Sequence, residues 1–334
     1  MNKTQVSYDD VLIVPKYSTI KSRNECSLVP YYGLGDHVKN KPKLQIPIIA
    51  ANMDTITGIE MAKYMHSVGG IGILHRNLPV AEVLKLQEVM PVFAAVGSID
   101  TDKDRILTFV KHNISLCVDI AHGHSLNMER TLKFISDYDT GNIVIAGNVC
   151  TPTGVEDVFN WGADIVKVGV GGGSACTTRI KTGCGYPQFG ALAEIRSMDT
   201  EIPIIADGGI KNFGDAAKAL AIGANFVMIG GMLAGTDKTP NWDPNSSFTN
   251  FRGMASMDAK KATGLQLAYE EGVSVMIKTK PEGSTNKVIS SMCDGIRSAM
   301  SYCGVRNLKQ FRDEADFIHI STSSQQENYA HIQG

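Results

Sequence analysis

Eight short apolar runs, separated by stretches with helical periodicity, constrain the fold of this chain more than any other feature. The runs are continuous rather than alternating, as in PIIAA and IVIAG, which is typical of parallel strands buried inside a protein. Between them, apolar residues recur at intervals of three and four, the spacing of a helix with one buried face. The expected strands are Pro47–Asn52, Gly70–Leu74, Val92–Gly97, Leu116–Ala121, Ile143–Gly147, Asp164–Val170, Pro203–Gly209 and Phe226–Gly231. The expected helices are Ile59–His66, Val80–Met90, Asp102–His112, Leu126–Ser136, Gly154–Trp161, Phe189–Met198 and Asp215–Ile222.

The strict alternation of strand and helix predicts right-handed crossovers between parallel strands. Eight such units favour an α/β fold of the closed (β/α)8 TIM-barrel type. An open, doubly wound sheet is the alternative that a count of short runs leaves open. We expect one catalytic domain over residues 1–334, with an N-terminal extension at 1–46, a surface loop or finger at about 235–250 and a C-terminal helical pair within Lys287–Phe311.

The charge balance argues against polyanionic partners. Lys and Arg total 32 against 34 for Asp and Glu, so the chain has no overall positive field to hold a nucleic acid or an anionic membrane. The seven cysteines are an odd number, and the sequence opens with neither a signal peptide nor an apolar run of membrane-spanning length, which predicts a cytoplasmic protein. No CxxC pair or HExxH motif indicates a zinc site. A small-molecule substrate is therefore expected.

The segment from Lys167 to Gln188 has the composition of a reactive loop. Three successive glycines, at 171–173, allow the backbone to approach a ligand closely, and Cys176 follows them. A thiolate is a strong nucleophile where positive charge stabilises it, and Arg179 and Lys181 are candidates for that charge. The alternative is that Cys176 is a small buried apolar residue.

Polar residues and glycines gather at the carboxyl ends of the expected strands, where the active sites of TIM barrels lie. Gly208 and Gly209 follow the seventh strand, and Gly230 and Gly231 the eighth, which is the usual position of a phosphate site built from backbone N–H groups. Asp207 is suited to accept hydrogen bonds from ribose hydroxyls, with a helix N-cap as its alternative role. The strand-end positions are Asn52–Asp54, His75–Arg76, Gly97, Asp119–His124, Asn148, Gly169–Arg179, Asp207–Gly209 and Gly230–Gly231.

Six motifs are spread over most of the chain: AANMDT at 50–55, AGNV at 146–149, KVG…GGSACTTR at 167–179, ADGGI at 206–210, MIGGMLAGT at 228–236 and FRGMAS at 251–256. Together they closely resemble the inosine-monophosphate dehydrogenase and guanosine-monophosphate reductase family. The chain is more similar to the reductases, because KTGCGYPQ at 181–188 resembles their KTGxGYPQ and YEEG at 269–272 their catalytic glutamate segment. No pair of CBS-type regulatory modules interrupts the chain between Ala81 and Asp100, and no Arg-Tyr flap of the dehydrogenase kind is found.

The resemblance implies NADPH-dependent reductive deamination of GMP to IMP and ammonia. On this interpretation Cys176 forms a covalent thioimidate with C2 of the purine, and Thr178 with Glu271 carries the proton to the departing ammonia. Glu270, next in the sequence, leaves the register of the acid open. The alternatives are an NAD-dependent IMP dehydrogenase without regulatory modules and a catalytically silent purine-nucleotide-binding barrel. The resemblance also implies a homotetramer.

The resemblance further implies ligands for each part of the site. The implied substrate-binding residues are Ser174, Asp207, Gly208, Gly209, Gly230, Gly231, Arg252, Gly253 and Met254. The implied cofactor-binding residues are Ser22, Arg23, Arg76, Asp119, Ala121, His122, Val170 and Gly171, with the first two reaching the dinucleotide of an adjacent chain. The carbonyls of Gly171, Gly173 and Cys176 match a site for a monovalent cation such as K⁺.

Three positions depart from the family pattern. His122 stands where the reductases usually have Asn, which bears on the geometry of the hydride donor. Arg76 replaces a common lysine, and a guanidinium is planar and bulkier than an ammonium. Gly172 replaces the proline of a GPG turn, which loosens the loop and bears on cation dependence.

Overall fold

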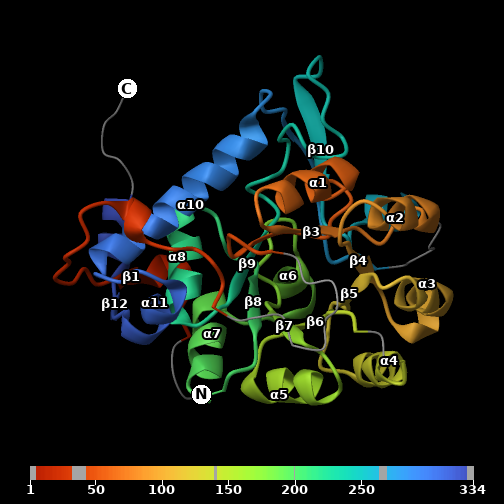
Figure 1. Ribbon diagram of the computed structural model, residues 1–334, viewed down its shortest axis with the longest axis horizontal. Coiled ribbons are helices and arrows are strands. Elements are labelled where there is room, and N and C mark those ends of the chain that lie inside the picture. The colour runs from red at the N-terminus through yellow and green to blue at the C-terminus, as the bar shows by residue number, and fades with distance from the viewer. Residues whose placement is uncertain (1–4, 32–42, 139–140, 199, 263–268, 329–334) are drawn as a thin grey trace.

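Within the residues that the computed structural model describes, eight parallel strands form a closed barrel (Figure 1). Those residues are 5–31, 43–138, 141–198, 200–262 and 269–328. The strands follow one another around the barrel in chain order, and β2 closes it by pairing with β9. The (β/α)8 prediction is therefore confirmed, and the open-sheet alternative is wrong. The strands are β2 (Ile48–Ala50), β3 (Ile71–Leu74), β4 (Phe93–Val96), β5 (Ser115–Asp119), β6 (Val144–Val149), β7 (Ile165–Val168), β8 (Ile204–Asp207) and β9 (Phe226–Ile229).

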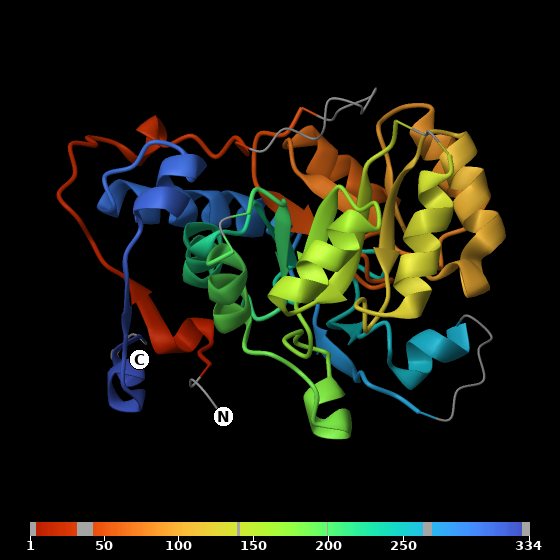
Figure 2. The same ribbon diagram turned by 90° about the horizontal axis from the view of Figure 1, so that it is seen from below.

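Helices surround the barrel at the predicted periodic stretches (Figures 1 and 2). Local sequence explains their starts: Thr151 Oγ1 accepts the N–H of Gly154 at 3.2 Å, with Pro152 at the first helical position. One helix begins at Ile99 rather than at Asp102, because a first turn joins the rest across a kink at Asp102. The helices are α1 (Ile59–Ser67), α2 (Val80–Gln87), α3 (Ile99–Lys111), α4 (Leu126–Ser136), α5 (Pro152–Asn160), α7 (Gln188–Arg196) and α8 (Phe213–Ile222). The short α6 (Thr178–Thr182) was not expected from the sequence.

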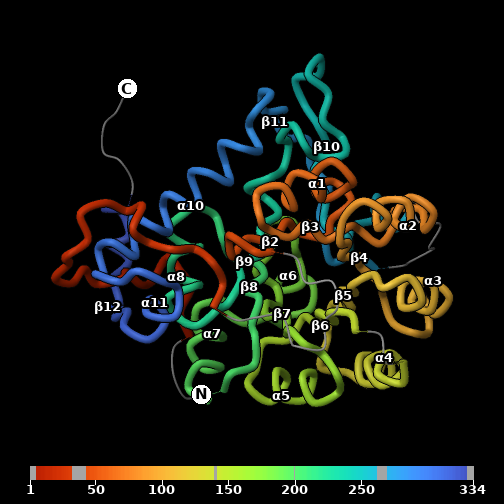
Figure 3. Tube along the Cα trace, viewed as in Figure 1, coloured from red at the N-terminus to blue at the C-terminus, as the bar shows by residue number. Residues whose placement is uncertain are grey.

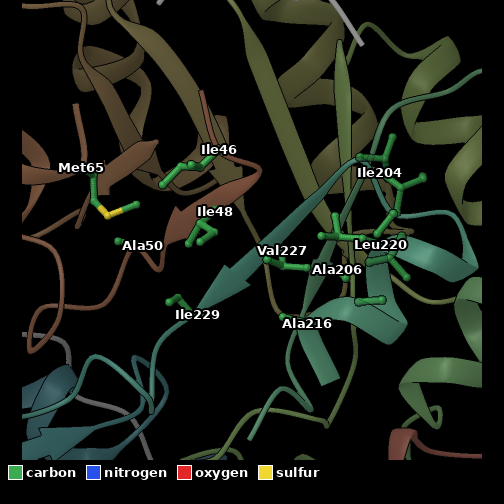
Figure 4. Close-up of a cluster of buried hydrophobic side chains, with 14 of the residues drawn as sticks. Ile46, Ile48, Ala50, Met65, Ile204, Ala206, Ala216, Leu220, Val227 and Ile229 are labelled. Atoms are coloured by element: carbon green, nitrogen blue, oxygen red, sulfur yellow. The ribbon is translucent and has the colours of Figure 1, made fainter. Parts of the chain in front are cut away.

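Side chains along each strand alternate between the barrel interior and the helix layer. The interior holds an apolar cluster that includes Ile49, Ile165 and Ile205. Because side chains two residues apart share a face, Lys167 in β7 is directed into the interior with Ile165. The alternate residues face outward and pack against the helices; Figure 4 shows Ile46, Ile48, Ala50, Met65, Ile204, Ala206, Ala216, Leu220, Val227 and Ile229 of this outer layer.

Two segments from opposite ends of the described chain pair beside the barrel. A short antiparallel pair joins β1 (Val11–Ile13) to β12 (Phe317–His319), and η1 (Tyr8–Asp10) packs against α8. The predicted helical pair is confirmed as α10 (Ser284–Tyr302) and α11 (Leu308–Glu314). Residues 1–4 and 32–42 of the predicted extension lie outside the described residues. The remaining elements here are η2 (Arg23–Glu25), α12 (Thr322–Gln325) and η3 (Gln326–Asn328).

A hairpin after the barrel was not expected. Strand β10 (Phe248–Arg252) pairs antiparallel with β11 (Ser274–Lys278), and α9 (Met257–Ala262) lies between them in the sequence (Figure 3). The expected loop at about 235–250 therefore ends earlier, because its last three residues belong to β10. Among the described helices, none has the length and apolar character needed to cross a bilayer.

Candidate active site

The reactive loop lies against the loop that follows β8. Gly169 has a φ of +152°, and a Cβ on it would stand 1.8 Å from the carbonyl oxygen of Asp207, so only glycine permits this approach. The two loops are also joined by a backbone hydrogen bond, in which the N–H of Gly209 donates to the carbonyl of Gly172 at 2.9 Å. The segment carrying the nucleophile and the expected phosphate loop thus form one surface.

A hydrogen-bonded chain links three predicted catalytic residues. The thiol of Cys176 donates to Thr178 Oγ1 at 3.2 Å, and the Thr178 hydroxyl donates to Glu271 Oε2 at 2.8 Å. All three side chains are partly exposed, so a ligand can reach them. We call this arrangement the Cys–Thr–Glu chain. It joins a nucleophile to a carboxylate through a hydroxyl that can pass a proton in either direction.

Backbone pairing brings Glu271 to the loop. The N–H of Thr177 donates to the carbonyl of Glu271 at 2.9 Å, and that of Val273 donates to Ala175 at 3.0 Å. This two-residue extension of β11 sets the register: Glu271 faces Thr178, whereas Glu270 Oε2 accepts the N–H of Met257 at 3.4 Å. Of the two neighbouring carboxylates, Glu271 is therefore the one that contacts the hydroxyl of Thr178.

The expected cationic neighbour of the thiol is engaged elsewhere. Arg179 Nη2 donates to the carbonyl of Tyr186 at 2.6 Å. Its methylene groups fill the space beside Gly171 and Gly185, at each of which a Cβ would stand 2.7 Å from Arg179 Cγ. Arg179 thus closes the loop on itself rather than stabilising the thiolate.

The predicted phosphate residues gather beside the same loop. A Cβ on Gly231 would stand 2.6 Å from Ser174 Oγ, so Ser174 and Gly231 are adjacent. A Cβ on Gly208 would stand 3.1 Å from backbone atoms of the glycine loop. Gly209, with a φ of +78°, has the left-handed conformation that favours glycine. The glycine loop and the loops after β8 and β9 are therefore in direct contact with one another.

A buried lysine that was not among the predicted site residues joins two predicted ligand residues. Lys167 Nζ lies 2.7 Å from Asp119 Oδ1 and 2.9 Å from Asp207 Oδ2, and it also donates to Asn148 Oδ1. The Lys167 side chain is only 2% exposed. Asn148 Nδ2 donates to Asp207 Oδ2 at 2.9 Å, and Asn52 Nδ2 to Asp119 Oδ2 at 2.9 Å. We call Lys167, Asp119, Asn148 and Asp207 the carboxylate hub.

The contacts within the hub keep Asp119 and Lys167 charged. Burial alone would raise the pKa of Asp119, but the Lys167 ammonium and the hydrogen bonds of Lys167 and Asn52 bring it below the usual value. Burial alone would lower the pKa of Lys167, but the carboxylates of Asp119 and Asp207 raise it well above the usual value. The sequence signal was a lone lysine inside the apolar run Asp164–Val170, since a charge in a buried strand requires partners.

Comparison with known proteins identifies the family. The model of the IMP dehydrogenase / GMP reductase domain matches residues 5–331. The chain belongs to this family. It is 36% identical to the GMP reductase of Yersinia pestis (strain Pestoides F), over 97% of this chain and 96% of that one. It is 32% identical to the inosine-5′-monophosphate dehydrogenase of Cryptosporidium parvum, over 98% of this chain and 94% of that one.

A solved structure agrees with the fold. A variant of GMP reductase from Trypanosoma brucei, in complex with guanosine 5′-monophosphate, superposes with a TM-score of 0.89 at 25% identity, covering 99% of this chain and 98% of that one. The predicted resemblance is therefore confirmed. The chain is an oxidoreductase of the IMP dehydrogenase / GMP reductase family.

The predicted cofactor residues of this family member are not all brought together. Asp119 lies in the hub, and Ala121 and His122 are exposed just beyond β5. Val170 and Gly171 begin the glycine loop, whereas Arg76 pairs with Asp102 at 3.1 Å. Ser22 caps η2 and Arg23 lies 3.6 Å from Asp294 of α10. Figure 1 shows this N-terminal segment on the side of the molecule with α10 and α11, whereas α6 projects over the barrel, beyond one end of its strands in Figure 2.

The predicted ligands of the monovalent cation are backbone carbonyls of the reactive loop. Gly171, Gly173 and Cys176 lie within one short segment, and the Gly173 carbonyl accepts the N–H of Cys176 at 3.1 Å. A carbonyl has two lone pairs, so this bond leaves Gly173 one position for an ion. No cluster of three or more His, Cys, Asp or Glu side chains suited to a metal occurs in the part of the chain that the structure describes.

Proposed function

We propose that the chain catalyses the NADPH-dependent reductive deamination of GMP to IMP and ammonia. Cys176 Sγ bonds to C2 of the purine, the C2–N bond of the amino group breaks, and the amino group takes up a proton and leaves as ammonia. A bound reduced nicotinamide supplies a hydride. With that hydride added at C2, the C–S bond would break and Cys176 would leave as its thiolate.

The observation that carries the proposal is the Cys–Thr–Glu chain. Its hydrogen bonds of 3.2 and 2.8 Å run from the thiol through Thr178 to the Glu271 carboxylate. Passing the thiol proton along it creates the nucleophile and a carboxylic acid in one step. Glu271 can then return that proton through Thr178 to the departing nitrogen. The thiol hydrogen and the amino group together account for the ammonia.

The substrate assignments follow the family positions. Ser174, Gly208, Gly209, Gly230 and Gly231 offer N–H and hydroxyl groups to the phosphate. Asp207 accepts from the ribose, and its place in the hub supports a fixed orientation. Arg252, Gly253 and Met254 contact the base.

The cofactor assignments are part of the same proposal. Asp119, Ala121, His122, Val170 and Gly171 hold the nicotinamide end. Arg76 binds further along the dinucleotide, and Ser22 with Arg23 completes the site from an adjacent subunit of a homotetramer. The carbonyls of Gly171, Gly173 and Cys176 bind K⁺. All seven cysteines are free among the described residues, which supports a reducing, cytoplasmic location.

One assay separates this function from its nearest alternative. IMP dehydrogenation with NAD is the second candidate, because the Cryptosporidium parvum protein matches almost the whole chain. The purified enzyme is mixed with GMP and NADPH, and in parallel with IMP and NAD, and absorbance at the nicotinamide wavelength is followed. We expect oxidation of NADPH with release of one ammonia per turnover. Activity only in the second mixture would overturn the proposal in favour of the dehydrogenase.

A further inference from the structure

Asp54 and Arg252 form an ion pair that connects the barrel to the hairpin outside it. Arg252 Nε lies 3.1 and 3.2 Å from the two carboxylate oxygens of Asp54, and Nη2 lies 2.7 Å from Oδ2. The residues are 198 positions apart in the chain. Asp54 follows β2, whereas Arg252 ends β10, a strand that pairs only with β11 among the described elements.

Further contacts surround this ion pair. Asn77 Nδ2 donates to Asp54 Oδ2 at 3.2 Å. The backbone N–H of Asp54 lies 3.3 Å from Met254 Sδ, and that of Arg252 lies 3.4 Å from Thr55 Oγ1. The same loop carries Asn52, which donates to Asp119 of the hub. The segment Arg252–Met254 is therefore attached to the β2 loop at both of its ends.

Both side chains of this ion pair are largely buried, which restricts the geometry in which they can bond. The Asp54 side chain is 6% exposed and that of Arg252 is 19% exposed. A buried carboxylate must be fully hydrogen-bonded, and a bidentate guanidinium fixes distance and plane together. The guanidinium is therefore occupied by Asp54, and what Arg252–Met254 can offer a ligand is its backbone.

We propose that Asp54 is a positioning residue that holds the segment Arg252–Met254 against the barrel so that it can recognise the purine base. The inference rests on the proposed function, since it presumes that this segment meets the base of the nucleotide. Asp54 touches no reacting atom. The predicted phosphate residues lie on the glycine loop and after β8 and β9, and none of the hydrogen bonds among the described residues joins them to this pair.

The test measures binding of a whole nucleotide and of its base-free part. GMP and ribose 5-phosphate are titrated by calorimetry into wild type, Asp54→Asn and Arg252→Lys. Asp54→Asn keeps the shape but sets an amide against the guanidinium, and we expect GMP binding at least about tenfold weaker with ribose 5-phosphate unchanged. Arg252→Lys keeps the charge without the fork, and we expect about threefold weaker GMP binding.

Asp237→Asn is the matched control. The Asp237 side chain is 4% exposed and accepts the N–H of Thr285 at 2.7 Å, at the start of α10. We expect it to lower the melting temperature without changing either affinity. Equal loss of both ligands in Asp54→Asn, or loss of neither, would overturn the inference. If wild type binds GMP no better than ribose 5-phosphate, base recognition itself is absent and the proposed function fails instead.

Discussion

The carboxylate hub and the Cys–Thr–Glu chain lie at the same end of the barrel but are built in different ways. The hub takes its residues from β5, β6, β7 and β8, which are neighbours in the sheet. The Cys–Thr–Glu chain joins two loop segments whose partners are 93 residues apart. The pairing of neighbouring barrel strands fixes the hub. A short backbone pairing between Cys176 and Gly272, just before β11, fixes the Cys–Thr–Glu chain.

This difference separates orientation from chemistry. Side chains on paired strands hold their positions well, which suits the binding of ribose and nicotinamide. Loop residues can move toward a ligand and withdraw, which suits a nucleophile and a proton carrier. We therefore expect changes in the loop chain to reduce turnover while leaving the fold stable, and changes in the hub to reduce stability as well as activity.

The largest effect is expected from Cys176→Ala. The covalent step cannot occur, so turnover should fall by at least about 10³-fold, while GMP still binds because the glycine loop and phosphate residues remain. Steady-state kinetics and calorimetry measure the two quantities. Turnover within tenfold of wild type would exclude the covalent mechanism.

Glu271→Gln replaces the proton-carrying carboxyl group by an amide of nearly the same shape. We expect deamination to fall by about 10²-fold, the lower end of the usual range for a general acid, and so by less than in Cys176→Ala. Hydride transfer itself needs no acid, so mixing IMP with NADP⁺ should still yield a first turnover of NADPH, slowed less than deamination is, because only the deprotonation of Cys176 is impaired. Glu270→Gln is the control, because Glu270 contacts Met257 instead of Thr178. Ammonia release at the wild-type rate in Glu271→Gln would place the acid elsewhere.

The barrel could be predicted from the sequence because its signals are local. Continuous apolar runs mark the strands, and intervals of three and four mark the helices, each within about ten residues. Cys176 and Thr178 could be predicted from one contiguous motif. The pairing of Val11 with His319 could not, because three-residue strands at opposite ends of the chain carry no local signal of their partner.

The carboxylate hub likewise depends on contacts between distant parts of the chain, which the local sequence does not indicate. Asp119 and Asp207 stood out at strand ends, but Lys167 interrupts an apolar run and gives no indication of which carboxylates it meets. Only closure of the barrel places β5 and β8 on either side of its side chain. The choice between Glu270 and Glu271 likewise depends on the register of a backbone pairing.

Lys167→Met should lower both the stability of the fold and the activity of the enzyme. It leaves Asp119 and Asp207 without their shared cation, and breaking such a buried pair destabilises by about 3 to 5 kcal/mol. We expect kcat/KM to fall by about 10-fold to 100-fold, since Lys167 orients ligand residues and touches no reacting atom. Urea unfolding measures the first effect. An unchanged unfolding free energy would show that the hub does not stabilise the fold.

The pH dependence of this variant has a definite sign. In wild type the lowered pKa of Asp119 gives stability that is present above about pH 4, the ordinary pKa of aspartate, and lost as pH falls through the lowered value. The raised pKa of Lys167 gives stability that is present below about pH 10 and lost as pH rises through the raised value. The hub's contribution is therefore constant near neutrality. In Lys167→Met, burial, the largest influence, is opposed only by the Asn52 hydrogen bond and the Arg76 charge. We therefore expect the pKa of Asp119 to be raised, so stability should fall as pH rises from about 4 toward 7.

The smallest effect is expected from Arg23→Ala, which tests a region distant from both networks. Arg23 is about half exposed and its contact with Asp294 is 3.6 Å long, so little holds it in place within one subunit. If it binds the dinucleotide of an adjacent subunit, the KM for NADPH should rise by about tenfold, the loss of one charge-assisted contact, while that for GMP stays the same.

Arg297→Ala is the matched control, because Arg297 also contacts Asp294, at 3.7 Å, but belongs to α10. Light scattering of the same samples measures the subunit number. A fully active monomer, or equal NADPH kinetics in both variants, would show that each barrel binds its dinucleotide alone.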